Sequence, residues 1–289
     1  MFGQAGWPGG TRAVRWEGDR VLPLDDGTGR CDLLRVNSAG LAVGAHTRPG
    51  HPTRATAWRA GRRWHPHPRA ALASAAVGVD ESDGVLVRGR LPEGGDGLWL
   101  WRGGEPRELV GGGCAGAVLG PAGHVAVEVV DPDGVRHLLL WHDGAARDLP
   151  RPGPGPLLPL ALNHHGDGVF LARCGPVPRV LLWRAGAWAE CAGAAPADGL
   201  PTGVLINSRG GTAVRDASGR TPVAINERGT VLAAEPDGGA AVLDERGWTR
   251  IPPPAGGRVL PAALHPFLPW VVGDLLDRDG RTRRPFLYR

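Results

Sequence analysis

Residues 32–67 read DLLRVNSAGLAVGAHTRPGHPTRATAWRAGRRWHPH, and this stretch is the clearest copy of a unit that recurs along the chain. It contains four short runs, at residues 32–36, 41–46, 54–59 and 62–67. Turn-forming residues separate the runs: Asn37 to Gly40, a Pro/Gly loop at 49–52, and Ala60-Gly61. Asparagine bonds its own backbone in such turns, and glycine takes positive φ without steric cost. Short runs without a sustained helical period predict four antiparallel strands.

The unit recurs with a period of about 42 residues. Tryptophan marks it at Trp16, Trp58, Trp101, Trp141 and Trp183, with gaps of 42, 43, 40 and 42 residues. The first turn also recurs, with variation, at 80–84, 120–123, 163–166, 207–210 and 226–229. Four-stranded antiparallel units repeated at a fixed spacing of this length are the blades of a β-propeller. The tryptophans are well placed to fill the apolar layers between stacked blades.

Complete units at 31–68, 76–110, 115–150, 157–191 and 202–253 predict five blades, and the two ends of the chain predict a sixth. Residues 282–289 read as a third strand, and residues 11–16 and 20–24 supply third-strand and fourth-strand phrases. We therefore expect one domain over residues 1–289, an all-β six-bladed propeller with four-stranded antiparallel blades. One blade would be shared by residues 11–24 and 257–289. The alternative is seven blades, because the unit at 202–253 holds two turns, Asn207 and Asn226, only 19 residues apart.

The repeated phrase resembles the HAF repeat of bacterial propeller-like proteins. Its closest copies pair a turn phrase with a tryptophan phrase, at 36–44 with 57–61 and at 161–166 with 182–186. The resemblance extends over about residues 11–289 and implies a propeller fold. The family's His-Ala-Phe triplet is absent, since residues 55–57 read Ala-Thr-Ala. Fold alone does not imply a function.

Composition excludes several classes of protein. All 33 basic residues are arginine, and this bias, with that toward Ala, Gly, Pro and Trp, is typical of a GC-rich bacterial genome such as an actinomycete's. The net charge of +4 is spread among interspersed acidic and basic residues. Because nucleic-acid-binding proteins gather their basic residues in a patch or stripe, we expect no nucleic-acid partner.

The beginning of the chain also carries an expectation about location. Residues 1–10 have neither the charged nor the apolar segment of a signal peptide. No apolar run reaches the roughly 18 residues that a membrane-spanning helix needs. We therefore expect a cytoplasmic monomer without membrane attachment, whose four cysteines are buried thiols.

Charged residues replace a small residue of the second run in unit after unit. Where the first unit has Gly44-Ala45-His46, the later units have charges at Arg88, Arg90, Glu128, Arg173, Arg215, Asp216, Glu235 and Asp274. Equivalent positions of successive blades lie at one height in a propeller, so these side chains and His46 predict a belt of mixed charge. The belt lines the central funnel if the second strand lies near the axis. Otherwise these residues are solvated strand ends on the outer edge.

In the funnel interpretation the belt is a substrate site. Its binding residues are Arg88, Arg90, Arg173, Arg215 and Glu235, and the arginines would hold a carboxylate or enolate oxygen. Glu128, Asp274 or His46 would be the catalytic acid or base. His65 and His67 lie on one face of a strand, as a metal pair would, but no third ligand stands at a recognisable spacing. We expect no metal and no cofactor, and the five serines include no Gly-x-Ser-x-Gly nucleophile elbow.

Two classes of function remain open. The first is a cytoplasmic propeller that binds a small molecule in its axial funnel, including a cofactor-independent cyclase, lyase or isomerase of specialised metabolism. The second is a non-catalytic scaffold that presents loops to a protein partner. Carbohydrate or surface binding is a third interpretation. A charge-lined pocket on the order of several hundred Å³ favours the first class.

Overall fold

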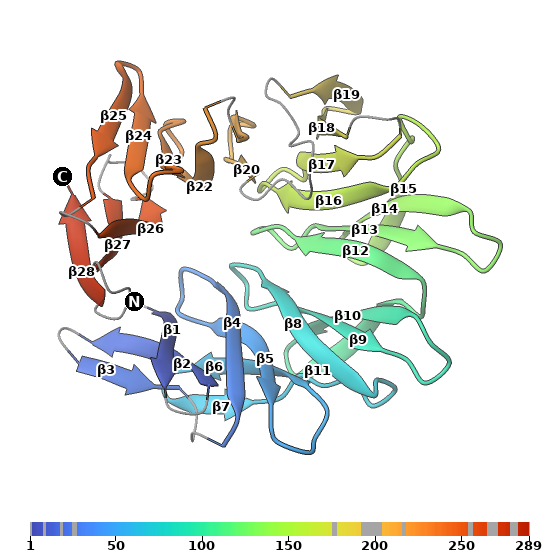
Figure 1. Cartoon of the computed structure of the whole chain (residues 1–289). Helices are drawn as coiled ribbons and strands as arrows, with labels where there is room; N and C mark the ends of the chain where they lie inside the picture. Colours follow the sequence, from blue (N-terminus) through green and yellow to red (C-terminus); the bar gives the residue numbers. More distant parts are fainter. Residues whose placement is uncertain are drawn as a thin grey trace. The chain divides into compact units, whose positions relative to one another are not determined.

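The computed structural model describes residues 2–7, 10–17, 20–24, 28–174, 178–191, 204–215, 218–253, 257–264, 271–277 and 283–288. Within these ranges the chain is all β, and paired strands run antiparallel (Figure 1). None of the described residues forms a helix that is long and apolar enough to cross a membrane. Contacts divide the chain into two compact units, Met1–Arg151 and Pro152–Arg289. The single domain over residues 1–289 stays a prediction.

The first unit contains one three-stranded sheet and three four-stranded sheets, each built from consecutive strands. The three-stranded sheet consists of β1 (Phe2–Trp7), β2 (Gly10–Glu17) and β3 (Arg20–Pro23). The next sheet consists of β4 (Arg30–Val36), β5 (Ala42–Thr47), β6 (Arg54–Arg59) and β7 (Arg62–Trp64). It is followed by β8 (Ala73–Val79), β9 (Val85–Arg90), β10 (Asp96–Arg102) and β11 (Glu105–Val110). The last is β12 (Cys114–Leu119), β13 (Val125–Val130), β14 (Arg136–His142) and β15 (Ala145–Asp148).

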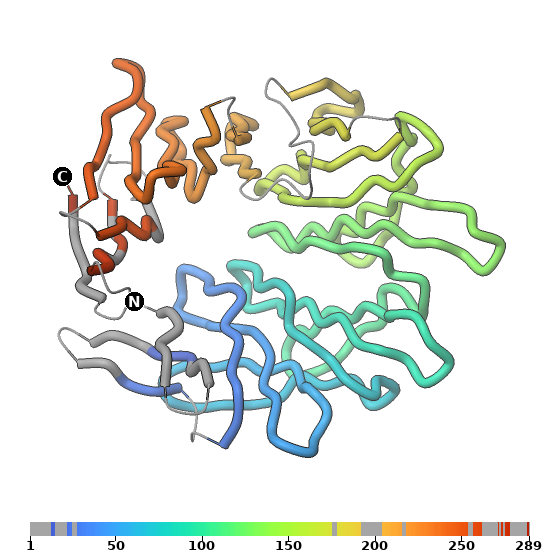
Figure 2. Tube along the Cα trace, viewed as in Figure 1, coloured from blue at the N-terminus to red at the C-terminus, as the bar shows by residue number. Residues whose placement is uncertain are grey.

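The second unit repeats this plan, and the chain completes each sheet before it begins the next (Figure 2). Its first four-stranded sheet consists of β16 (Leu157–Leu162), β17 (Gly168–Ala172), β18 (Arg179–Arg184) and β19 (Ala187–Glu190). A two-stranded sheet follows, β20 (Leu205–Ile206) and β21 (Thr212–Ala213). The second four-stranded sheet consists of β22 (Thr221–Ile225), β23 (Val231–Ala234), β24 (Ala240–Asp244) and β25 (Gly247–Ile251). The last sheet has three strands, β26 (Arg258–Leu264), β27 (Val271–Leu276) and β28 (Arg283–Tyr288).

The described residues therefore form five complete four-stranded blades, and the predicted six is not the number found. Among the described residues of the two ends, β2 pairs with β1 and β3, and β27 pairs with β26 and β28, so the blade shared by residues 11–24 and 257–289 stays a prediction. At the N-terminal end, β1 takes the place beside β2, with pairs from Phe2–Arg15 to Trp7–Gly10. The sequence interpretation had assigned residues 2–7 to no blade, which left this neighbour unforeseen.

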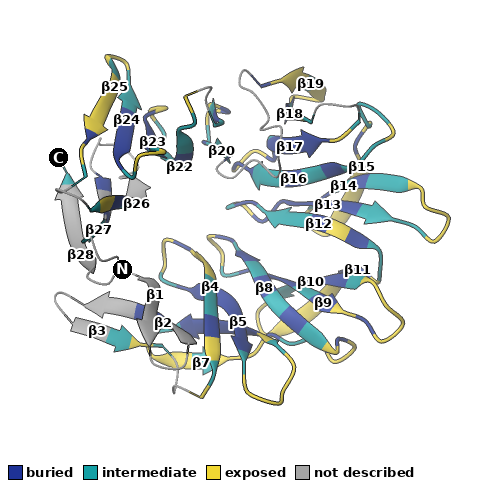
Figure 3. Ribbon diagram, in the orientation of Figure 1, coloured by how far each residue is buried: buried dark blue, intermediate teal, exposed yellow. Residues whose placement is uncertain are grey.

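Burial differs systematically among the strands of a blade (Figure 3). The second strands β5 and β17 are almost wholly buried, whereas the fourth strands β15, β19 and β25 are mostly exposed. Because the strands of each blade follow one another in chain order, the second strand always lies between the first and the third. The fourth strand is therefore the solvent-facing edge, and the second strand is interior.

The apolar cores lie between neighbouring blades. One cluster joins Leu41 and Val43 to Val85 and Val87 of the next sheet, with Trp101 packed against it. The prediction that the repeated tryptophans are structural is met most fully by Trp58 and Trp183, which are 1% and 4% exposed. Trp101 and Trp141 are half-buried. The side chain of Trp16 lies outside the described residues.

Asparagines of the first turn link one blade to the next. Each accepts hydrogen bonds from backbone N–H groups of its own turn through Oδ1. Each also donates through Nδ2 to a carbonyl of the following turn: Asn37 to Asp80 at 2.9 Å, Asn163 to Asn207 at 3.2 Å, and Asn207 to Asn226 at 3.0 Å. One side chain thus satisfies its own turn and ties that turn to its neighbour, which explains why asparagine recurs at this position.

The same link accounts for the oversized unit at 202–253. The hairpin β20–β21 keeps the first turn of a blade and little else, yet Asn207 receives the link from Asn163 and passes one to Asn226. The two turns stand 19 residues apart in the sequence, and the described residues between them form no strands other than β21 and β22.

Replacing Asn207 with aspartate should test this link. The carboxylate keeps the Oδ1 acceptor for Arg209 and Gly211, but it loses the N–H that reaches the Asn226 carbonyl. Because the site is buried, we expect the free energy of unfolding to fall by about 1–3 kcal/mol, measured by denaturant titration. Thr249→Asp, which adds the same charge on exposed β25, is the control and should have little effect. Equal stability of Asn207→Asp and the parent would show that the link contributes nothing.

Candidate functional site

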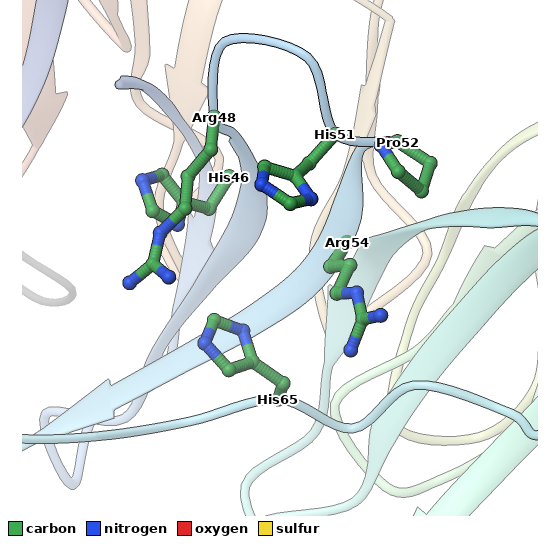
Figure 4. Close-up of a pocket in the computed structure, with 6 residues that line it drawn as sticks. All are labelled: His46, Arg48, His51, Pro52, Arg54 and His65. Atoms are coloured by element: carbon green, nitrogen blue, oxygen red, sulfur yellow. The ribbon is translucent and has the colours of Figure 1, made fainter. Parts of the chain in front are cut away.

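A pocket of about 280 Å³ opens beside the β5–β6 hairpin of the first unit. Figure 4 shows its side chains arranged around a common space, with His46 and Arg48 opposite Arg54, and His51 opposite His65. Pro52 completes the lining. We call it the histidine–arginine pocket. It presents three imidazoles and two guanidinium groups, and none of its lining residues is acidic.

The loop between β5 and β6 is held by bonds of its own. Thr47 and Thr53 join their hydroxyl groups at 2.8 Å across its base, and the His51 N–H donates to the Arg48 carbonyl at 3.0 Å. Gly50 takes a φ of +74°, which permits the tight turn. The loop and the connection that follows β7 lie at the same end of this blade, because strands β5 to β7 alternate in direction. His65 of that connection therefore meets the basic residues of the loop.

Hydrogen bonds fix the tautomer of His65. Its Nδ1 lies 3.0 Å from the Thr56 hydroxyl and 3.3 Å from the Ala55 carbonyl. Thr56 donates its own proton to the Arg54 carbonyl at 3.1 Å, so both oxygen partners of Nδ1 are acceptors. Nδ1 must then carry the proton, and in the neutral ring Nε2 is the unprotonated nitrogen.

His65 is also biased toward its neutral form. Partial removal from water lowers its pKa below the ordinary value of 6.5, although the hydrogen bond to Ala55 raises it. The charges of Arg63, Arg54 and Arg48 lower the pKa further. At neutral pH this imidazole is therefore a base with an available lone pair.

His67 does not join His65 as a metal pair. Its Nδ1 lies 2.7 Å from the hydroxyl of Ser74, and burial lowers its pKa as well. Over the part of the chain that the structure describes, no group of three His, Cys, Asp or Glu side chains could hold a metal ion. A second cavity, of about 590 Å³, shares Arg48 and His51 with the pocket and gives a ligand room to extend along the loop.

The described residues of the predicted charge belt lie on second strands or just after them, and among them only His46 lines the pocket. His46 is 4% exposed, and its ring is nearly parallel to that of His65, with centroids 6.2 Å apart. Arg88 and Arg90 both face Asp96: Arg88 Nε donates to Oδ2 at 2.7 Å, and Arg90 Nη1 lies 4.0 Å from Oδ1. Both arginines are therefore engaged by Asp96, and Arg88 also donates through Nη2 to the Cys114 carbonyl of the next blade at 3.3 Å.

The two glutamates of the belt each lie between two arginines. Oε1 of Glu128 is 3.3 Å from Arg136 Nη1 and 3.2 Å from Arg151 Nη2. Glu235 accepts from Arg220 Nε at 3.2 Å and from Arg250 Nε at 2.8 Å. Glu128 lies in β13 and Glu235 directly follows β23, and both carboxylates are largely removed from water, so they need such partners. These contacts give both residues a structural explanation.

The remaining members of the belt belong to the second unit. Arg173 is exposed, and its backbone N–H donates to the Pro156 carbonyl at 2.9 Å. Arg215 is half-buried and follows β21. Asp274 lies in β27, opposite Leu260 and Pro285, and its side chain lies outside the described residues, as does the whole of Asp216.

The sequence interpretation missed Arg48, His51 and Arg54. A signal was present, because residues 46–54 read His-Thr-Arg-Pro-Gly-His-Pro-Thr-Arg, with four basic or imidazole side chains and no acid. His65 was singled out, but as half of a metal pair.

Comparison with known proteins bears on the fold. No family model matches the chain, and no curated protein matches it. The resemblance to HAF repeats therefore stays a prediction. Among solved structures, the β-propeller domain of the Trilobed protease from Pyrococcus furiosus aligns with a TM-score of 0.51 and 9% identity, over 96% of this chain and 90% of that one.

A puromycin-hydrolyzing peptidase from Mycobacterium tuberculosis aligns with a TM-score of 0.52 and 14% identity, over 95% of this chain and 49% of that one. This chain thus spans about half the length of the peptidase. Virginiamycin B lyase from Staphylococcus aureus aligns with a TM-score of 0.44 and 14% identity, over 90% and 84% of the two chains. Identities this low concern the fold and not the activity. The chain has an all-β propeller fold with four-stranded antiparallel blades.

Proposed function

We propose that this protein binds a small anionic molecule in the histidine–arginine pocket. The observation that carries the proposal is a lining of guanidinium and imidazole groups with no acidic side chain among them. Arg54 and His51 make no side-chain hydrogen bond or ion pair with any described residue, so their donors are available to a ligand. A guanidinium group recognises a carboxylate or phosphate through paired, charge-assisted hydrogen bonds.

The pocket also has the parts for cofactor-independent chemistry. A carboxylate held by Arg54 would place its neighbouring carbon near the imidazoles. His65, neutral and unprotonated at Nε2, would remove a proton from that carbon, and the guanidinium groups would stabilise the enolate oxygen. Removal of this proton is a first step from which elimination, cyclisation or isomerisation of a carboxylate substrate proceeds, so we propose a lyase, cyclase or isomerase. Glu128 is a less suitable base because two arginines already occupy it.

Removal of one guanidinium should weaken anion binding. We expect Arg54→Ala to raise the dissociation constant for malonate, used as a probe, by roughly tenfold, since charge-assisted hydrogen bonds are lost. Isothermal titration calorimetry measures the change. Arg62→Ala is the matched control, because it removes the same charge from an exposed position in the same blade that does not line the pocket. An equal loss in both variants would show that general charge, and not the pocket, attracts the anion.

The affinity for malonate should also depend on pH. The pKa of His65 lies below 6.5, so its imidazole gains a proton only as the pH falls through that lowered value. The added charge should then strengthen anion binding in acid, and His65→Gln should flatten that part of the profile.

Proton abstraction has the opposite dependence on pH, because a base works only when unprotonated. Exchange of carbon-bound protons of small carboxylic acids in D₂O, followed by NMR, should therefore rise with pH and vanish in His65→Gln.

A further inference from the structure

Another cavity, of about 800 Å³, lies over three turns of the second unit. Its basic residues are Arg209 in the β20–β21 turn, Arg228 in the β22–β23 turn and Arg246 in the β24–β25 turn. Asp244 and Glu245 are its acidic residues. We call this cavity the arginine groove. It shares no residue with the histidine–arginine pocket, which belongs to the first unit.

The three arginines occupy the same position in three turns of one kind. In each turn an Asn or Asp two residues earlier accepts a hydrogen bond from the arginine backbone N–H. The distances are 3.1 Å from Arg209 to Asn207, 3.0 Å from Arg228 to Asn226, and 2.8 Å from Arg246 to Asp244. Such turns fix the backbone and leave the side chain free to project outward.

Two of these turns are also tied together. Asn207 Nδ2 donates to the Asn226 carbonyl at 3.0 Å, and the Ser208 hydroxyl bonds the carboxylate of Glu227. Arg209 and Arg228 are therefore presented from a rigid pair of equivalent positions. The backbone of this site is ordered before a ligand arrives, so only the side chains lose conformational entropy on binding.

The three guanidinium groups of the arginine groove are available to bind a ligand. The nearby arginines Arg220 and Arg250 are both taken by Glu235. Within the described chain, by contrast, the exposed side chains of Arg209, Arg228 and Arg246 make no ion pair or hydrogen bond. Asp244 uses Oδ1 for its own turn. Three guanidinium groups thus face one cavity without acidic partners that bind them.

We propose that the arginine groove binds a small ligand carrying several oxyanion groups, of which a short polyphosphate is the simplest. Each guanidinium presents paired donors that match the oxygens of a phosphate or carboxylate. A single oxyanion can satisfy one such group, whereas a chain of linked oxyanions reaches two or three at once. The linked turns hold Arg209 and Arg228 ready for that bridging.

Titration of inorganic tripolyphosphate tests the proposal. The background variant is Arg54→Ala, which weakens anion binding in the histidine–arginine pocket. In this background we expect Arg209→Ala/Arg228→Ala to weaken tripolyphosphate binding on the order of 100-fold, about tenfold for each guanidinium removed. Orthophosphate cannot bridge the two side chains. It should therefore bind the Arg54→Ala background more weakly than tripolyphosphate does, and its affinity should fall less in the double variant. Arg246 lies in a separate turn, so Arg246→Ala is an independent test of the groove. It should weaken tripolyphosphate binding about tenfold.

Control variants distinguish specific binding in the arginine groove from a general attraction of the anion to positive charge on the protein. Arg147→Ala removes an exposed arginine from β15, outside the groove, and should leave the affinity unchanged. Melting temperatures of all variants should equal that of the parent, because the three side chains support no described contact. An unchanged dissociation constant for tripolyphosphate in the double variant would overturn the proposal. An equal loss in Arg147→Ala would overturn it too, since binding would then follow net charge. Malonate binding to Arg54→Ala tests the histidine–arginine pocket alone, so its outcome does not bear on the arginine groove.

Discussion

Replacing Trp58 with alanine is expected to lower the free energy of unfolding by about 3–5 kcal/mol. The indole is 1% exposed, and its buried cluster consists otherwise of Ala13, Cys31 and Ala42. Such short side chains cannot move far enough to fill the space that an indole leaves. The cavity term should therefore add to the lost transfer free energy. Ala13 belongs to β2, so the substitution should also loosen the N-terminal sheet from the first complete blade.

Two variants make this measurement specific. Trp101→Ala should cost less, because Trp101 is half-buried and its ring N–H already reaches the Gly104 carbonyl at the surface. Trp58→Phe should cost less than Trp58→Ala, since the Trp58 N–H is buried without a hydrogen-bond partner among the described residues. Denaturant titration of the three proteins provides the free energies. Equal losses for Trp58→Ala and Trp101→Ala would mean that the deeper burial of Trp58 adds nothing to the free energy of unfolding.

The repeat was the part of the fold that the sequence revealed best. Trp58 and Asn37 recur because each solves a problem common to every blade: one fills the layer between blades, and the other satisfies a turn and ties it to the next. Signals of this kind are local and repeated, so they are readable without an alignment. The four-stranded blades follow from them.

The number of blades was harder to predict, because it depends on the copies that depart from the repeat. The stretch β20–β21 keeps a turn without outer strands, and β1 has no repeat phrase at all, yet it pairs along β2. Pairing at the ends of the chain is decided by which strand edge is nearest in space. A sequence period contains no information about that choice.

The predicted charge belt depended on the order of strands from the interior outward, which the sequence does not give. Charges on the second strands looked like a shared belt. In the structure, Arg88 of β9 pairs with Asp96, and Glu235, which directly follows β23, pairs with two arginines. The pocket forms instead where one loop and one connection meet, and only His46 belongs to both sets. Arg54 and His65 come together only in the tertiary structure, and neither their spacing in the sequence nor their charge predicts that they line one pocket.

Glu128 is the residue for which structural and catalytic roles predict opposite results. Its carboxylate is 2% exposed and lies between Arg136 and Arg151, whose side chains are 30% and 16% exposed. Glu128→Ala would leave two largely buried guanidinium groups without this acid, so the free energy of unfolding should fall by about 3–5 kcal/mol. The matched control is Glu190→Ala, which breaks the exposed pair with Arg179 and should cost less than about 1 kcal/mol. Denaturant titration compares the two, and malonate titration at a temperature where both variants are folded provides the second readout. Because Glu128 does not line the histidine–arginine pocket, its loss should destabilise the protein and leave malonate affinity unchanged. A stable Glu128→Ala protein with impaired malonate binding would show that Glu128 has a functional role and not a structural one.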